Sequence, residues 1–193
     1  TTGDLGQGFG YFGTFGVDGT NTTSSATLLN NTGDALYGTA GFATVLNAVS
    51  GFSRFTFTSD TLNNFTNLKV YYLNNVGGAS FQILVDGVVL LTVNTSGAKS
   101  VQVASLTGLS DAVHTIECRQ TTAGTVTLLD LHMERSLPKG IMVTDIGHGG
   151  YTAANYIPIQ TNTLKYYSEN PSDLYIVRLG VNDLNSSYLG SHI

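Results

Sequence analysis

Short, regularly spaced strand signals fill the segment from about residue 42 to residue 133, and they constrain the fold more than any other feature of the chain. Apolar side chains alternate along residues 81–85 and lead into Asp86-Gly87. This dipeptide is typical of two-residue hairpins, because both central positions of that turn need a positive φ. Residues 88–93 supply the return strand. About seven or eight such strands, about 8–12 residues apart and without helical periodicity, predict an antiparallel β-sandwich.

A different pattern follows, in which two longer apolar runs, 141–146 and 174–179, each end in a glycine-containing turn, 147–150 and 180–183. A helix-like segment separates the runs, so the whole is typical of a strand–helix–strand crossover, which is right-handed in nearly all proteins. The two strands are then parallel, and both turns emerge at the same edge of the sheet. Open α/β sheets bind their ligands at this edge.

The helix of this unit is expected to begin with Asn155 as its N-cap, which puts Pro158 in the first turn, where N–H groups have no intrahelical partner. Ile157, Leu164 and Tyr167 then share one face. Parallel sheets need cover on both faces. Two strands with one helix do not provide it, and the unit is therefore expected to need further protein around it.

The chain is thus predicted to be β-rich and to have three parts. Residues 1–41 form a connector rich in Gly, Asn and Thr, residues 42–138 form the antiparallel sandwich, and residues 139–193 form a partial α/β unit.

Composition narrows the functions that are open to the chain. The net charge is −5 and the eight Lys and Arg residues are scattered singly, which argues against a nucleic-acid partner. No apolar run approaches the roughly 18–20 residues of a membrane span. Cys118 is the single cysteine and is expected to be a buried, inert thiol. No group of His, Cys, Asp or Glu has the spacing of metal ligands, so neither a metal nor another cofactor is expected.

Gly180-Val181-Asn182-Asp183 resembles the third signature block of the SGNH (GDSL-type) hydrolases, a superfamily of serine esterases and lipases with a flavodoxin-like α/β core. The glycine of the second block is matched by Gly150. The resemblance implies that the Gly150 backbone N–H and the Asn182 side-chain amide are oxyanion-hole donors. Asp183 is expected to be structural and to bond nearby backbone, rather than to act as a catalytic acid.

The two remaining blocks of the family are missing. At the Gly-Asp-Ser block, Gly3-Asp4-Leu5 has leucine where the nucleophile is required, and His192 has no aspartate at the spacing of the last block. His148 lies on a turn without an acidic partner in the sequence, which favours a surface role over that of a base. The sequence is therefore interpreted as a middle piece of a larger esterase, inactive by itself.

Residues 77–87 resemble the jelly-roll module inserted between the first two blocks of many bacterial and phage SGNH hydrolases. This resemblance implies a glycan-holding insert, a polysaccharide or acetylated glycan as partner, and a location outside the cell or on a virion surface. Two hypotheses stay open. One is a carbohydrate O-deacetylase. The other is a receptor- or glycan-binding module of a phage tail fibre, without catalytic activity and homotrimeric. His114 and His132 are expected to serve packing in either case.

Overall fold

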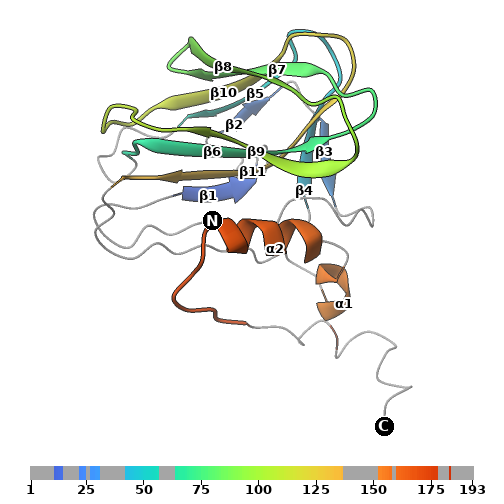
Figure 1. Ribbon diagram of the computed structural model, residues 1–193, viewed down its shortest axis with the longest axis vertical. Helices are drawn as coiled ribbons and strands as arrows, with labels where there is room; N and C mark the ends of the chain where they lie inside the picture. The colour runs from blue at the N-terminus through green and yellow to red at the C-terminus, as the bar shows by residue number, and fades with distance from the viewer. Residues whose placement is uncertain are drawn as a thin grey trace.

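The computed structural model describes residues 11–14, 22–24, 27–30, 42–56, 64–136, 152–157, 160–177 and 183. Their strands and helices follow one another along the chain, strands first and helices last (Figure 1). They are β1 (Tyr11–Thr14), β2 (Thr22–Ser24), β3 (Thr27–Asn30), β4 (Phe42–Leu46), β5 (Phe52–Thr56), β6 (Asn67–Asn74), β7 (Ser80–Val85), β8 (Val88–Asn94), β9 (Ser100–Leu106), β10 (Thr115–Gln120), β11 (Val126–Glu134), α1 (Ala153–Tyr156) and α2 (Gln160–Glu169).

The strands form two sheets that lie face to face (Figure 1). The first sheet has the order β3-β4-β11-β6-β9, with β1 also paired to β11, and the second has the order β2-β5-β10-β7-β8. Every pair of these strands is antiparallel. The predicted β-rich, two-sheet antiparallel sandwich is confirmed. Strands β1, β2 and β3 belong to it as well, although they come from the segment expected to be a connector.

The predicted hairpin joins β7 to β8. Its two turn residues both have positive φ, 52° at Asp86 and 80° at Gly87. Val85 then pairs with Val88 across the turn. Glycine adopts this conformation without a steric cost, and aspartate tolerates it better than most residues. The local sequence was therefore sufficient to specify this turn.

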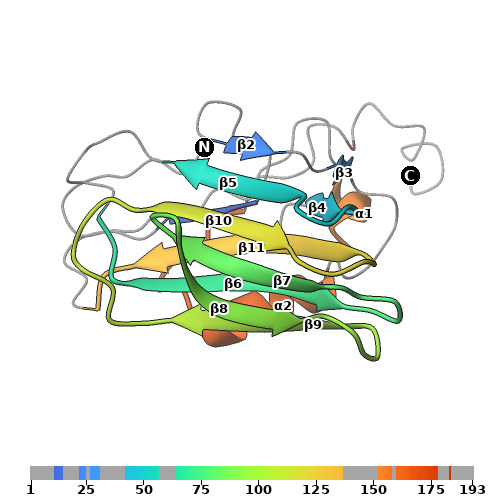
Figure 2. The same cartoon turned by 90° about the horizontal axis from the view of Figure 1, so that it is seen from above.

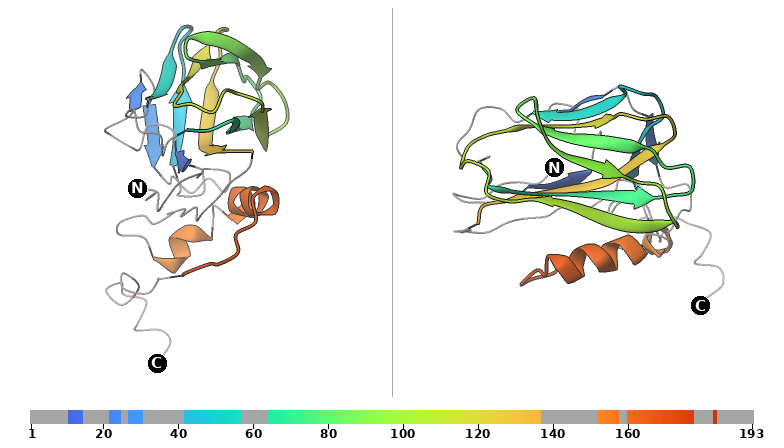
Figure 3. Two further views of the ribbon diagram at one scale, coloured as in Figure 1. Left: turned by 90° about the vertical axis from the view of Figure 1, so that its left-hand side faces the viewer. Right: turned by 45° about the horizontal axis from the view of Figure 1, so that its top comes forward.

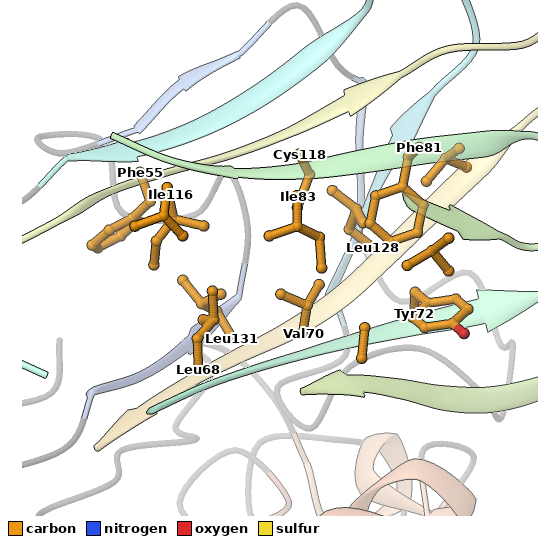
Figure 4. Close-up of a cluster of buried hydrophobic side chains, with 14 of the residues drawn as sticks. Phe55, Leu68, Val70, Tyr72, Phe81, Ile83, Ile116, Cys118, Leu128 and Leu131 are labelled. Carbon is orange, nitrogen blue, oxygen red and sulfur yellow. The ribbon is translucent and has the colours of Figure 1, made fainter. Parts of the chain in front are cut away.

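The main core lies between the two sheets and is built from alternate residues of their strands (Figure 4). Strand alternation sends these side chains inward and their neighbours outward. Cys118 belongs to this core, and burial, followed by the nearby charge of Glu117, raises the pKa of its thiol far above the usual range. The thiol is thus inert, as expected. The residues of this core that are labelled in Figure 4 are Phe55, Leu68, Val70, Tyr72, Phe81, Ile83, Ile116, Cys118, Leu128 and Leu131.

Helix α2 lies against the outer face of the first sheet (Figure 3). Its Tyr166 is only 1% exposed and meets the Tyr71 ring edge-on, with 5.6 Å between ring centroids. The Tyr166 hydroxyl lies 3.1 Å from Nδ1 of the buried His132. A buried tyrosine usually finds a polar partner for its hydroxyl, and here the partner is a histidine of β11.

A chain of hydrogen bonds extends this contact. The Tyr71 hydroxyl donates to Oε2 of Glu169 (2.8 Å) and accepts from Nδ2 of Asn170 (2.8 Å). Lys69 Nζ donates to Oδ1 of Asn170 (2.6 Å). Burial raises the pKa of Tyr71, so the hydroxyl keeps its proton and remains a donor. The C-terminal helix is therefore fastened to the sandwich by specific polar contacts as well as by apolar packing.

The helical segment differs in detail from the prediction. Thr152 is the N-cap of α1, and Asn155 lies inside the helix, where its Oδ1 accepts the Thr152 N–H (2.8 Å). Ile157 and Leu164 are exposed, and the face that packs on the sheet centres on Tyr166. Of the three residues expected on one face, Tyr167 packs against the Tyr166 cluster, Leu164 does not, and Ile157 is the C-cap of α1 and is not part of α2. Pro158 lies outside the described residues. Tyr166 combines a larger apolar area with a hydroxyl that His132 can satisfy.

Residues 174–177 also differ from the prediction, because they form no strand and their side chains are 54–85% exposed. A strand requires a neighbour for its backbone hydrogen bonds. The run expected as that neighbour, residues 141–146, lies outside the described residues, as do residues 178 and 179. No strand–helix–strand crossover is thus present in the part of the chain that the structure describes. In that same part, no helix is long and apolar enough to cross a membrane.

Candidate functional site

The two predicted oxyanion donors, Gly150 and Asn182, lie outside the described residues, and their mutual geometry stays a prediction. His148 also lies outside them. The structure does describe residues that adjoin both motifs: Thr152 to Tyr156 behind the first glycine turn, and Asp183 at the end of the second.

Asp183 reaches the helix that begins just after the first glycine turn. Its carboxylate accepts the Ala153 backbone N–H, at 3.0 Å from Oδ1 and 3.3 Å from Oδ2, across 30 residues of sequence. Ala153 is the first residue of α1, where a backbone N–H has no partner within the helix. Asp183 therefore bonds backbone, as expected from the sequence.

A second group has the residue types of a hydrolytic triad. His114 Nδ1 lies 2.6 Å from Oδ2 of Asp86, and Ser110 Oγ lies 3.4 Å from His114 Nε2. The three residues come from the β7–β8 turn and from the loop before β10. The imidazole is buried, and the Phe65 ring meets it edge-on, with ring centroids 5.0 Å apart.

The hydrogen bonds of this group argue against catalysis. His114 Nε2 lies 2.9 Å from the Ser110 backbone carbonyl oxygen, closer than it lies to the Ser110 hydroxyl. Nε2 is thus directed at the backbone carbonyl more closely than at the serine hydroxyl, whereas a general base needs its lone pair directed at that hydroxyl. The group instead ties the loop to the hairpin, which agrees with the packing role expected for His114.

The Asp86 carboxylate gives this tie a dependence on pH. Desolvation raises the pKa of Asp86, but hydrogen bonds from His114 and from the Thr115 N–H outweigh it, and the net shift is downward. A lowered folded-state pKa stabilises the fold above the unfolded pKa of about 3.9, and this contribution disappears as the pH falls through the folded value.

Asp86→Asn is expected to lower the thermal midpoint at pH 7 and to have a smaller effect as the pH approaches 3. Asn-Gly suits the same turn, so the substitution removes the charge with little change in turn preference. Thermal unfolding of both proteins between pH 3 and pH 7 measures the difference. Curves that stay parallel over this range would show that the Asp86 charge is not responsible.

The outer face of the second sheet carries an ionic cluster that the sequence analysis did not identify. Arg54 on β5 pairs with Glu117 on β10, directly opposite in the strand register, with 2.7 Å between Nε and Oε2. Arg119, two residues further along β10, forms an ion pair with the other carboxylate oxygen. Phe52 lies opposite Arg119, and the Arg54 guanidinium lies 5.1 Å from the centroid of its ring. We call Phe52, Arg54, Glu117 and Arg119 the arginine face.

Only the tertiary register reveals this cluster. Arg54 and Glu117 are 63 residues apart, and either one alone resembles an ordinary outward residue of an alternating strand. The remaining chemistry of the described residues is limited, since they include no group of three or more His, Cys, Asp or Glu side chains that could hold a metal ion.

No model of a protein family and no curated protein sequence matches the chain. Solved structures do. The chain is similar to a variant of the catalytic domain of a GH87 alpha-1,3-glucanase in complex with tetrasaccharides, at 14% sequence identity and a TM-score of 0.51. This similarity covers 86% of the chain and 35% of the glucanase chain.

Two further similarities are weaker. The CBM36-1 domain of a multidomain xylanase from the hindgut metagenome of Trinervitermes trinervoides has 13% identity and a TM-score of 0.49, over 68% of this chain and 99% of that domain. A family two carbohydrate esterase from Cellvibrio japonicus has 12% identity and a TM-score of 0.43, over 68% of this chain and 36% of the esterase. The aligned region spans about a third of the glucanase and esterase chains. The fold is a β-sandwich of a kind found in carbohydrate-active proteins.

Proposed function

We propose that the 193-residue chain is the glycan-holding part of an SGNH-type serine esterase that removes acetyl groups from a polysaccharide. The contact between Asp183 and the Ala153 N–H carries this proposal. Asp183 directly follows Asn182, and Ala153 comes three residues after Gly150. The contact therefore supports the expectation that the two signature turns lie at one site.

In the proposed reaction, a serine outside this sequence attacks the acetyl carbonyl carbon while a histidine, also outside it, takes the serine proton. The carbonyl oxygen becomes an oxyanion, which the Gly150 N–H and the Asn182 amide stabilise by hydrogen bonds. Collapse of the intermediate breaks the bond to the sugar oxygen, which takes the proton from the histidine and leaves as a hydroxyl. Water, deprotonated by the same histidine, then hydrolyses the acetyl-serine to acetate and restores the serine hydroxyl.

Two features support a role of the sandwich in holding the glycan. The first is its fold, which is similar to that of a glucanase domain in complex with tetrasaccharides. The second is the docking of α2, since hydrogen bonds from Tyr71 and Lys69 fix this helix on the first sheet. A polysaccharide held by the sandwich would then be kept at a constant distance from the signature turns. The proposed location of the protein is outside the cell or on a virion surface, both for an esterase and for a glycan-binding module without catalysis.

The 193-residue chain by itself is expected to show no serine-type esterase turnover, because oxyanion donors without a nucleophile give little catalysis. Purified chain is incubated with an activated acetate ester and with a fluorophosphonate probe. Turnover that the fluorophosphonate abolishes would contradict the assignment of the nucleophile to residues outside this sequence. The same chain linked to a Gly-Asp-Ser block and to an Asp/His block should release acetate from an acetylated polysaccharide.

A glycan-binding module without catalysis, as in a phage tail fibre, is the second candidate. The arginine face favours it, because this polar surface lies on the sheet opposite to α2 and does not depend on the signature turns. Light scattering distinguishes the two: the fibre hypothesis expects a trimer, and a monomer that gains esterase activity with the missing blocks would exclude it.

A further inference from the structure

We propose that the arginine face binds the anionic group of an acidic glycan, with a uronate carboxylate as the group that fits its geometry best. The inference rests on the proposed carbohydrate function and adds a ligand class to it. In this cluster, two guanidinium groups share one carboxylate.

The local charge is positive in a protein that is acidic overall. The side chain of Glu117 is 6% exposed, whereas those of Arg54 and Arg119 are 41% and 42% exposed. The negative charge is thus buried beneath the positive ones, and solvent meets mainly the guanidinium groups. The chain as a whole carries a net charge of −5 and eight Lys and Arg residues, so two exposed arginines at one carboxylate are a local departure from the average surface.

Among the described residues, Glu117 takes up only some of the donors of each arginine. A guanidinium has five N–H groups arranged in a rigid fork that matches a carboxylate bidentately. Glu117 engages Arg54 through Nε and one terminal nitrogen, and engages Arg119 through one terminal nitrogen. No other residue that the structure describes occupies the remaining N–H groups, and a second carboxylate bound there would complete an alternating arrangement of two cations and two anions.

The cluster is also held in place before any ligand arrives. Glu117 fixes both arginines from below, and the Phe52 ring holds the Arg54 guanidinium by a cation–π contact. Side chains that are already ordered lose less entropy when they bind. This order distinguishes the arginine face from single mobile lysines on a surface.

The neighbouring positions suit the hydroxyl groups of a sugar. Gln82 lies opposite Arg119 in the register, and Thr92 lies opposite Gln82. Figure 2 views this sheet from the side opposite to α2, and neither described helix covers it. A linear glycan can therefore lie across β10, β7 and β8 with its anionic group at the arginines.

The test uses affinity electrophoresis of the 193-residue chain in gels that contain polygalacturonate, its fully methyl-esterified form, or dextran sulfate. Methyl esterification removes the charge and keeps the sugar backbone. We expect retardation by polygalacturonate, a loss of that retardation on esterification, and roughly tenfold to hundredfold weaker binding for Arg119→Gln, the range of one charge-assisted contact. Lys99→Gln makes the same charge change away from the arginine face and is expected to bind as the unmodified chain does.

Arg119→Lys separates geometry from charge, because it keeps the charge and loses the fork. Binding weakened by Arg119→Lys supports recognition of a carboxylate, and binding retained by Arg119→Lys overturns it. A third outcome is that dextran sulfate retards the chain, polygalacturonate does not, and Arg119→Gln abolishes the retardation. The anionic group is then a sulfate and not a carboxylate. Equal retardation by the charged and esterified polymers overturns the inference and leaves the glycan function standing. Retardation by none of these polymers overturns the inference. Acetate release by the protein with its missing blocks then tests the proposed function separately.

Arg54 is left intact in all variants so that Glu117 keeps a partner. Thermal unfolding verifies that each variant is folded.

Discussion

Phe81→Ala is expected to lower the free energy of unfolding by about 3–5 kcal/mol, the usual range for removing a buried phenylalanine. Phe81 is fully buried between the two sheets, and its ring meets that of Tyr72 edge-on at 5.5 Å between centroids. The substitution removes apolar contacts from both sheets and leaves a cavity that the flanking strands cannot fill without moving. Urea unfolding, followed by tyrosine fluorescence, measures the change.

Val88→Ala is the matched control, because Val88 begins the neighbouring strand of the same hairpin and is 60% exposed. Its effect should stay within about 0.5 kcal/mol. Equal losses in the two variants would mean that the core does not lie where β7 and β6 face one another. Such a result would contradict the assignment of Phe81 to the interior.

Asn182→Ala is expected to lower kcat by about 10²–10³ in a protein that carries these residues together with the missing serine and histidine blocks. An oxyanion donor bonds mainly in the transition state, so KM should change little. Release of acetate from an acetylated polysaccharide gives both constants.

Asn185→Ala is the control, since it removes the same side chain three residues beyond Asn182 and outside the signature block. Activity should persist in this variant. If Asn182→Ala and Asn185→Ala both keep the kcat of the unsubstituted protein, the Gly-Val-Asn-Asp turn has a structural role only. The esterase hypothesis then loses its mechanistic basis. The described contact of Asp183 with Ala153 would then be an ordinary helix cap.

Much of the sandwich could be predicted because its information is local. Alternation of apolar residues determines which side chains face inward, and a shift of one residue would expose all of them. Asp86-Gly87 specifies a turn by backbone conformation alone. The helical segment was predicted less well: it contains two helices, α1 with Thr152 instead of Asn155 as its N-cap, and α2 with Tyr166 instead of Leu164 on its packed face. The correct face depends on the partner surface around Tyr71 and His132, which is distant in sequence.

The chain's own sequence was therefore enough to specify strand alternation and the β7–β8 hairpin, because each depends on a few neighbouring residues. Strand order, by contrast, required the tertiary structure. Strand pairing brings Arg54 beside Glu117 and Arg119, and loop packing brings Ser110, His114 and Asp86 together in an arrangement that is not catalytic. Residues 174–177 were likewise not predictable from sequence alone. A strand forms only beside a neighbouring strand, and an apolar run does not specify which strand that is. Local conformation is encoded by adjacent residues, whereas these groups are created by contacts across many tens of residues, whose geometry depends on register and on the packing of the whole sandwich.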